Sequence, residues 1–449
     1  MLRRPRHVTV GRIELLTMAL STLCLADMDA GGYATWPALG ALGISLLLLV
    51  AAMSYHRRLA PGHLPWIAGP FLVLLMMVRF GVTFPLALWP SILLTVLVVV
   101  CSLDCFGQES RRFWCTALVL AWVGILVIWI NVVPIHIDVI SILRDGSLRL
   151  LRGQDPYSGS YPSTTAGATA LPYTYSPATA ILAAPAAWIG NVRYSNLALG
   201  VTIAWALYRL GLRGAARVSH QSRTRLLPLI LAVPLMTPMV WAGWTEVYVL
   251  APFLLWLLWR GSHPRVAMGC LAVALGAKYT ILPVLVPLYL WSPKMRKDIV
   301  RAGTVSVLIF YLPFILWAGP ARFFHDTIGI FISLPAIPHS LALQSLLAYF
   351  GVPGPTVAVT GAVLAAALGG LVFWRPNDLS DLLLASSAFA FLAILVNRWA
   401  FFNYWALVAY VLLAALLTTG TAEAVALPRW IAVSRRLNSA IVGTVSDPS

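Results

Sequence analysis

Charged residues are scarce in this chain. Only 10% of its 449 residues are Asp, Glu, Lys or Arg, whereas 60% are hydrophobic and the mean hydropathy is +0.85. Soluble domains are usually about half apolar and about one quarter charged. The composition therefore argues against a soluble domain and predicts an integral membrane protein.

Acidic residues are the rarer charge, with 15 Asp and Glu against 31 Lys and Arg. The basic residues collect in short links between apolar segments, at 3–12, 57–58, 111–112, 209–225, 260–265, 294–301 and 429–436. This distribution is the positive-inside signal, which keeps basic links in the cytoplasm. It differs from the basic stripe with interleaved aromatics that binds RNA or DNA, so we expect no nucleic-acid partner.

Cysteines are few, and none lies in a long polar loop. The five are Cys24, Cys101, Cys105, Cys115 and Cys270. A disulfide framework is therefore not expected. Cys101 and Cys105 share a helix face, but no His or further Cys lies close by to complete a metal site. We expect neither a metal nor a cofactor.

Apolar segments recur along the whole chain, and several approach the ~20 residues that a spanning helix needs. Clear examples are 37–55, 86–103, 114–133, 299–317, 355–374 and 404–418. Together with the charged links, they predict an all-α polytopic transmembrane bundle of about 12–14 membrane segments in the cell membrane, with both termini cytoplasmic.

The same charge rule divides the chain. Residues 1–112 hold four N-terminal membrane helices of unknown role, and 419–449 form a cytoplasmic tail. The core lies between them, at 113–418. Its two long loops, 134–176 and 318–353, are predicted to be extracytoplasmic.

Two segments are predicted to depart from simple spans. Residues 177–189 are too short to cross comfortably, so we expect an interfacial or re-entrant helix followed by a return crossing at 193–211. The run 266–292 is flanked by basic links and should enter and leave by one face. Lys278 lies at its centre, and an unpaired lysine inside a membrane costs at least ~2.5 kcal/mol. Lys278 therefore either has a functional role facing a cavity or an anionic partner, or it extends to the membrane interface or pairs structurally with a carboxylate such as Glu246.

The loop 134–176 interrupts the apolar series with polar and aromatic residues. Within 138–152, apolar residues are mixed with arginines, which predicts an amphipathic helix on the outer membrane surface. Asp138 stands at its N-terminus, where it either caps the helix or acts chemically. In the following turn, Gly153 to Tyr157, Asp155 is expected to bond the local backbone.

The order of these elements resembles glycosyltransferase family 87, in the polytopic GT-C superfamily. The resemblance covers about residues 114–418 and is carried by IDV, LLRGQDPY and LPYTYSP, while GAKYTILP is similar to the family's later lysine-containing segment. It implies a GT-C-like catalytic membrane domain at 113–418, with its active site on the extracytoplasmic side. It also implies a polyprenyl-phosphate-linked sugar donor and inversion at the donor sugar.

Site roles follow from the resemblance residue by residue. Asp138 corresponds to the general base, and Lys278 would bind the donor phosphate as a point charge. Tyr157, Tyr173 and Tyr175 would line the sugar site, although interfacial anchoring explains tyrosines equally well.

Three further residues are expected to contact substrate or donor. Asp155 would bind substrate. His339 would be a second polar contact to the donor phosphate or to the acceptor, although a solvated loop histidine explains it equally well. Gln344 also falls in a substrate-binding position. However, Leu343 precedes it where the family commonly shows an Asn-Gln-Ser-Leu-like run, so this sequence departs from the pattern there.

The resemblance implies an enzyme that moves a sugar, mannose as the first choice and arabinofuranose as the second, to an extracytoplasmic glycolipid or glycan. A lipid or solute transporter, or a flippase, would also explain many helices and a buried lysine. Transporters tend, however, to place paired broken helices in two related halves. A non-catalytic scaffold would give Asp138 and Lys278 no reason to approach each other.

Overall fold

The computed structural model describes residues 18–20, 22–23, 36–54, 108–133, 135, 137–163, 170–214, 230, 236–330, 340–349, 351–352, 357–374, 376–397 and 402–418. This part of the chain is mostly helical, with one two-stranded hairpin within it. The all-α fold class is confirmed at this level.

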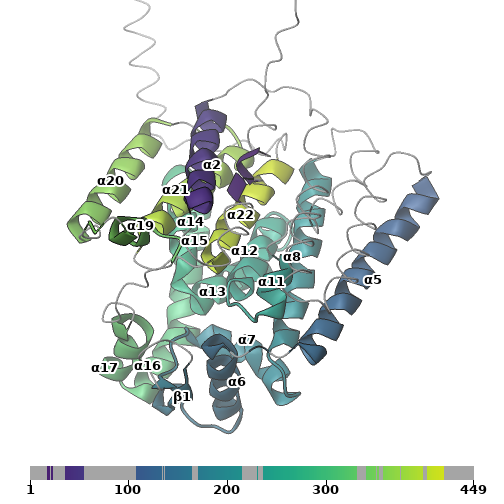
Figure 1. Cartoon of the computed structure of the whole chain (residues 1–449), viewed down its shortest axis with the longest axis vertical. Coiled ribbons are helices and arrows are strands. Elements are labelled where there is room, and N and C mark those ends of the chain that lie inside the picture. Colours follow the sequence, from purple (N-terminus) through teal and green to yellow (C-terminus); the bar gives the residue numbers. More distant parts are fainter. Residues whose placement is uncertain are drawn as a thin grey trace, which may run out of the picture.

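The first half of the described chain runs from α2 to α12 (Figure 1). Its elements are α2 (Trp36–Ser54), α5 (Gln108–Val132), α6 (Asp138–Leu151), η1 (Pro156–Ser158), β1 (Tyr161–Pro162), β2 (Ala170–Leu171), α7 (Pro177–Trp188), α8 (Arg193–Gly214), α11 (Met236–Trp241) and α12 (Val247–Trp259). β1 and β2 are antiparallel, with Tyr161 opposite Leu171.

The second half contains two short π-helical turns, η4 and η5. Its elements are α13 (Pro264–Ala277), η3 (Tyr279–Ile281), α14 (Leu282–Trp291), α15 (Pro293–Ser306), η4 (Val307–Tyr311), α16 (Leu312–Ala318), α17 (Pro320–Phe324), η5 (His325–Gly329), α19 (Leu343–Tyr349), α20 (Val357–Phe373), α21 (Leu379–Leu395) and α22 (Phe402–Leu417).

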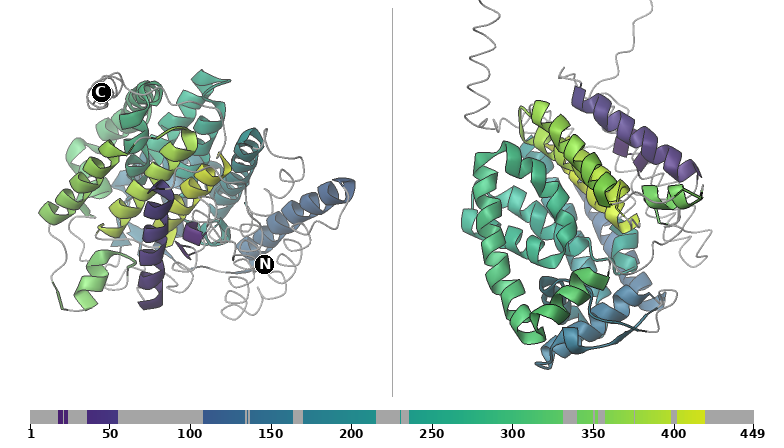
Figure 2. Two further views of the ribbon diagram at one scale, coloured as in Figure 1. Left: turned by 90° about the horizontal axis from the view of Figure 1, so that it is seen from above. Right: turned by 90° about the vertical axis from the view of Figure 1, so that its left-hand side faces the viewer.

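The core is a set of helices that are apolar around most of their circumference. α12 packs against α8 and α13, and α21 packs against α14 and α22. Figure 2 shows α21 and α22 as a layer between α2 and the helices α12 to α15. Trp122, Trp256 and Trp405 are fully buried there. A helix that is apolar all round requires such burial, either in protein or in lipid.

One described helix is long and apolar enough to cross a membrane. It is the continuous stretch α15–η4–α16, Pro293–Ala318, and only 17% of its most apolar window is buried. The pair α13 and η3–α14 passes the same test together, but it bends by 114° at its break. Six further apolar helices have 10–17 residues. The segment expected at 86–103 and the tail at 419–449 lie outside the described residues.

Several boundaries agree with the sequence. α7 ends at Trp188 and α8 begins at Arg193, which confirms the predicted break after a short helix. α13 and α14 confirm the predicted break in 266–292. The loop 318–353 differs from expectation, because it contains α17, η5 and α19.

α6 is a helix as predicted, but its apolar face lies on protein. Val139, Ile142 and Leu143 are buried, and Ser147 Oγ donates to Ala180 O of α7 at 3.0 Å. α6 and α7, with α16 and α17, form one end of the molecule in Figure 1. The prediction that α6 lies with this face on the outer membrane surface was therefore wrong: amphipathic periodicity shows that a face is buried, not what covers it.

Candidate functional site

The site is built on the break between α13 and α14. α13 ends at Ala277, and Lys278 has an extended backbone, with φ −164° and ψ 138°. The break leaves carbonyls of the last helical turn without helical partners. Thr179 Oγ1 donates to Ala277 O at 2.6 Å, and the Tyr311 hydroxyl donates to Leu275 O at 2.9 Å. Side chains from α7 and η4 thus hold the break open.

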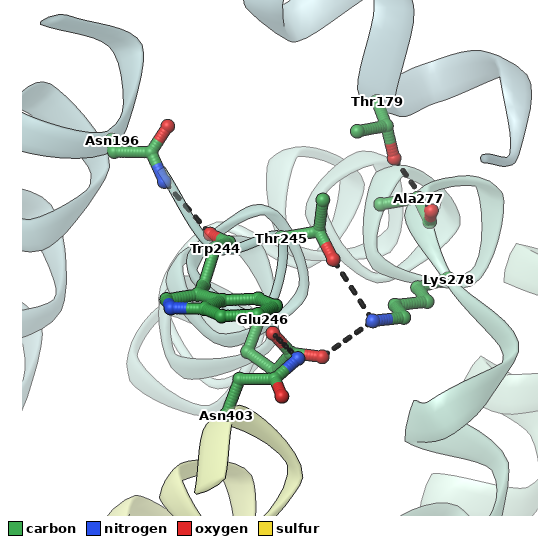
Figure 3. A network of polar contacts seen from close by, with 8 residues as sticks. All are labelled: Thr179, Asn196, Trp244, Thr245, Glu246, Ala277, Lys278 and Asn403. Carbon is green, nitrogen blue, oxygen red and sulfur yellow. Dashed lines mark hydrogen bonds and ion pairs between the residues drawn. The ribbon is translucent and has the colours of Figure 1, made fainter. Parts of the chain in front are cut away.

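The ammonium of Lys278 is paired inside the bundle (Figure 3). Its Nζ donates to Glu246 Oε1 at 2.5 Å and to Thr245 Oγ1 at 2.9 Å, and it lies 4.6 Å from the ring centroid of Tyr404. The other oxygen of Glu246, Oε2, accepts from Asn403 Nδ2 at 2.8 Å. The pairing of Lys278 with Glu246, one of the alternatives that the sequence left open, is therefore present in the structure.

The position of Glu246 is fixed from the other side by Asn196 of α8. Asn196 Nδ2 donates to Trp244 O at 2.7 Å and to Met239 O at 3.2 Å, while its Oδ1 accepts from the Tyr248 hydroxyl at 3.1 Å. Met239 lies in α11, Trp244 in the turn between α11 and α12, and Tyr248 at the start of α12. Asn196 therefore ties that turn, and Glu246 with it, to α8.

Asp138 is the first residue of α6 and is partly buried. Its Oδ1 accepts from the backbone N–H of Val139 at 2.9 Å, and the residue before it, Ile137, holds the N-cap position without a side-chain cap bond. Burial raises the pKa of Tyr175 well above its usual range, and the carboxylates of Asp138 and Glu246 raise it further.

The tyrosines of the loop form a packed cluster with Phe314 and Phe323. The ring centroids of Tyr157 and Tyr173 lie 5.3 Å apart, and both side chains are fully buried. The Tyr157 hydroxyl donates to Tyr175 O at 2.8 Å. The Tyr173 hydroxyl has no hydrogen-bond partner in the described part of the chain. Tyr157 and Tyr173 are thus packed inside the protein rather than exposed as interfacial anchors.

Gly146 of α6 makes room for this cluster. A Cβ at Gly146 would lie 2.4 Å from the ring of Tyr173. We expect Gly146→Ala to lower the free energy of unfolding by about 1–3 kcal/mol, the usual cost of overpacking. Chemical denaturation in detergent would measure this. The matched control is Gly124→Ala in α5, where a Cβ meets nothing within 4 Å; an equal loss in both variants would contradict the packing explanation.

The remaining predicted site residues are Asp155, Gln344 and His339. Asp155 Oδ1 accepts from Tyr157 N at 2.9 Å, which is the local turn bond expected for it. Gln344 lies partly buried near the start of α19. His339 lies outside the described residues.

Sequence reasoning missed Thr245, Asn403 and Tyr404, which come from two separate segments. A signal was present, because Thr245 and Asn403 are polar residues inside otherwise apolar runs. In the described ranges, no three His, Cys, Asp or Glu side chains gather as a metal site would require.

No family model matches this chain, and neither does any curated protein or solved structure. The chemistry of the site is therefore argued from its own geometry. That geometry offers an ammonium paired with a carboxylate at the break after α13, a second carboxylate at the start of α6, and a group of buried phenols.

Proposed function

We propose that the chain is an inverting membrane glycosyltransferase of the GT-C type. It moves a sugar, most simply mannose, from a polyprenyl-phosphate donor to an extracytoplasmic glycolipid or glycan acceptor. The observation that carries the proposal is that Asp138, at the start of α6, and the Lys278–Glu246 pair, at the break after α13, lie on helices that both pack against α7. A proton acceptor and a phosphate-binding cation are the two groups that this reaction needs.

In the proposed reaction, Asp138 takes the proton of the acceptor hydroxyl. The oxygen of that hydroxyl attacks the anomeric carbon of the donor sugar at the same time. The new glycosidic bond forms as the bond between that carbon and the phosphate oxygen breaks. The electron pair of the broken bond stays on the phosphate, where Lys278 stabilises the added negative charge.

The proposed setting is a multi-pass protein of the cell membrane. The exposed residues of Pro293–Ala318, among them Val300, Ile309 and Leu316, present an apolar face suited to lipid. Loops 134–176 and 318–353 then share the extracytoplasmic side, opposite the basic links.

Cysteine labelling checks this sidedness. In a background without the native cysteines, Gln154→Cys and Arg322→Cys should react with an impermeant reagent added to intact cells. Lys297→Cys, in an exposed basic link, should react only after the membrane is opened. If the loop positions react only from the cytoplasm, the proposed location of the active site is wrong.

Turnover of the purified protein with a panel of polyprenyl-phosphate sugars tests the activity itself. Transfer from the mannosyl donor supports the first choice, and transfer from the arabinofuranosyl donor supports the second. Failure with every donor, across a panel of glycolipid acceptors, would argue against a transferase.

A second candidate, a transporter or flippase, is favoured by one specific observation. Discontinuous helices with charged groups at the break are typical of transport sites, and α13–α14 bends by 114° at a lysine paired with Glu246. Flux of a labelled polyprenyl-phosphate lipid across proteoliposomes, without sugar transfer, would select this candidate.

A further inference from the structure

Lys278 and Glu246 differ in how far they are shielded. The Lys278 side chain is 11% exposed, whereas that of Glu246 is fully buried. The lysine side chain is therefore the more accessible member of the pair, and the carboxylate lies inside. An anion that approaches this pair meets the lysine first.

The ammonium has three N–H donors, and the described residues supply oxygen acceptors for two of them. These acceptors are Thr245 Oγ1 and Glu246 Oε1, and the Tyr404 ring lies near the ammonium as a weaker cation–π contact. Lysine also carries its charge on a flexible stem with rotatable donors. It can therefore exchange one anionic partner for another without moving the backbone.

Glu246 is supported as an anion even without Lys278. Its Oε2 accepts from Asn403 Nδ2, and it immediately precedes α12, whose N-terminus favours negative charge. Release of the ammonium would thus leave a carboxylate that still has a hydrogen-bond donor and a favourable helix dipole.

We propose that Glu246 is a built-in competitor for the phosphate at Lys278: the ammonium pairs with Glu246 in the empty site and transfers to the phosphate group when the ligand binds. Asn403 is the positioning residue that holds Glu246 in place during this exchange. The inference rests on the proposed phosphate role of Lys278 and adds how that site is occupied before the donor arrives.

The competition makes opposite predictions for two neighbouring residues. Glu246→Gln removes the competing charge and should tighten binding of a phosphate ligand by about tenfold, the scale of one hydrogen bond to a charged group. Asn403→Leu removes the donor that supports the free carboxylate and should weaken binding several-fold. A purely structural role would weaken binding in both variants.

The experiment uses the full chain in detergent and measures equilibrium binding of farnesyl phosphate, inorganic phosphate and farnesol. We expect tighter farnesyl phosphate binding by Glu246→Gln, weaker binding by Asn403→Leu and no change for uncharged farnesol. A gain with inorganic phosphate as well supports a site for phosphate itself, whereas a gain restricted to farnesyl phosphate supports a lipid headgroup site. These readouts need no sugar transfer, so a failed turnover assay would leave them intact.

Two further variants complete the test. Lys278→Met with Glu246→Gln leaves an uncharged pair and should bind farnesyl phosphate at least tenfold more weakly than the unmodified chain. Lys297→Met, which removes an exposed lysine, should bind like the unmodified chain. If Glu246→Gln does not fold, Asn403→Leu and the double variant still decide the matter. Three outcomes would overturn the proposal. They are unchanged or tighter binding by Asn403→Leu, unchanged or weaker binding by a folded Glu246→Gln, and a double variant that binds as tightly as the unmodified chain.

Discussion

Replacing Lys278 by Met should lower the free energy of unfolding by about 3–5 kcal/mol, because it leaves a buried carboxylate without its ammonium partner. Glu246 is fully buried and makes its shortest contact with Lys278. Thermal or denaturant unfolding in detergent would measure the loss. Because Lys278 is paired with Glu246, we expect this variant to lose stability as well as donor binding.

The double variant Lys278→Met with Glu246→Gln separates these effects. It removes both charges at once, so it should recover most of the lost stability. Binding of lipid phosphate should remain lost. If the double variant does not recover stability, the pair does more than neutralise its own charges. If Lys278→Met alone is fully stable, the pairing is contradicted.

Replacing Asp138 by Asn should reduce sugar transfer by about 100-fold or more, the lower range for removal of a general base. Asn preserves the size of the side chain and accepts hydrogen bonds as Asp does at a helix start. The variant should therefore stay folded and still bind lipid phosphate. Steady-state turnover with a polyprenyl-phosphate sugar, beside an unfolding curve, measures both quantities.

Asp145→Asn and Asp155→Asn are the matched controls. Asp145 pairs with Arg144 on the exposed side of α6, and Asp155 accepts a local turn bond that Asn can also accept. Both should have milder effects than Asp138→Asn. If Asp155→Asn abolished transfer while Asp138→Asn retained it, the base would have to be reassigned to the turn.

The local elements of the site could be predicted from the sequence. The start of α6 at Asp138, the turn at Asp155 and the break at Lys278 each depend on residues that are near neighbours in the chain. Polar groups that interrupt an apolar run mark such places, because each one needs a partner or water.

The partnerships across the bundle could be predicted only in part. Glu246 was a candidate partner because a charge in an apolar run needs an opposite charge. Asn403 was not, since it lies 157 residues from Glu246 and nothing in the local pattern links the two. The π turns η4 and η5 were also missed. The composition of an apolar run is the same whether its backbone hydrogen bonds join residues five apart, as in a π turn, or four apart, as in an α-helix.

The π turn Val307–Tyr311 makes the site sensitive to chain length. It accommodates one extra residue in an otherwise α-helical stretch, and Tyr311 at its end reaches Leu275 O at the break. Loss of one residue there would restore a regular helix but rotate Tyr311 by about 100° relative to the preceding turn. The hydroxyl would then leave the carbonyl that it bonds. Insertions and deletions in this helix are therefore constrained as strictly as substitutions at the site itself.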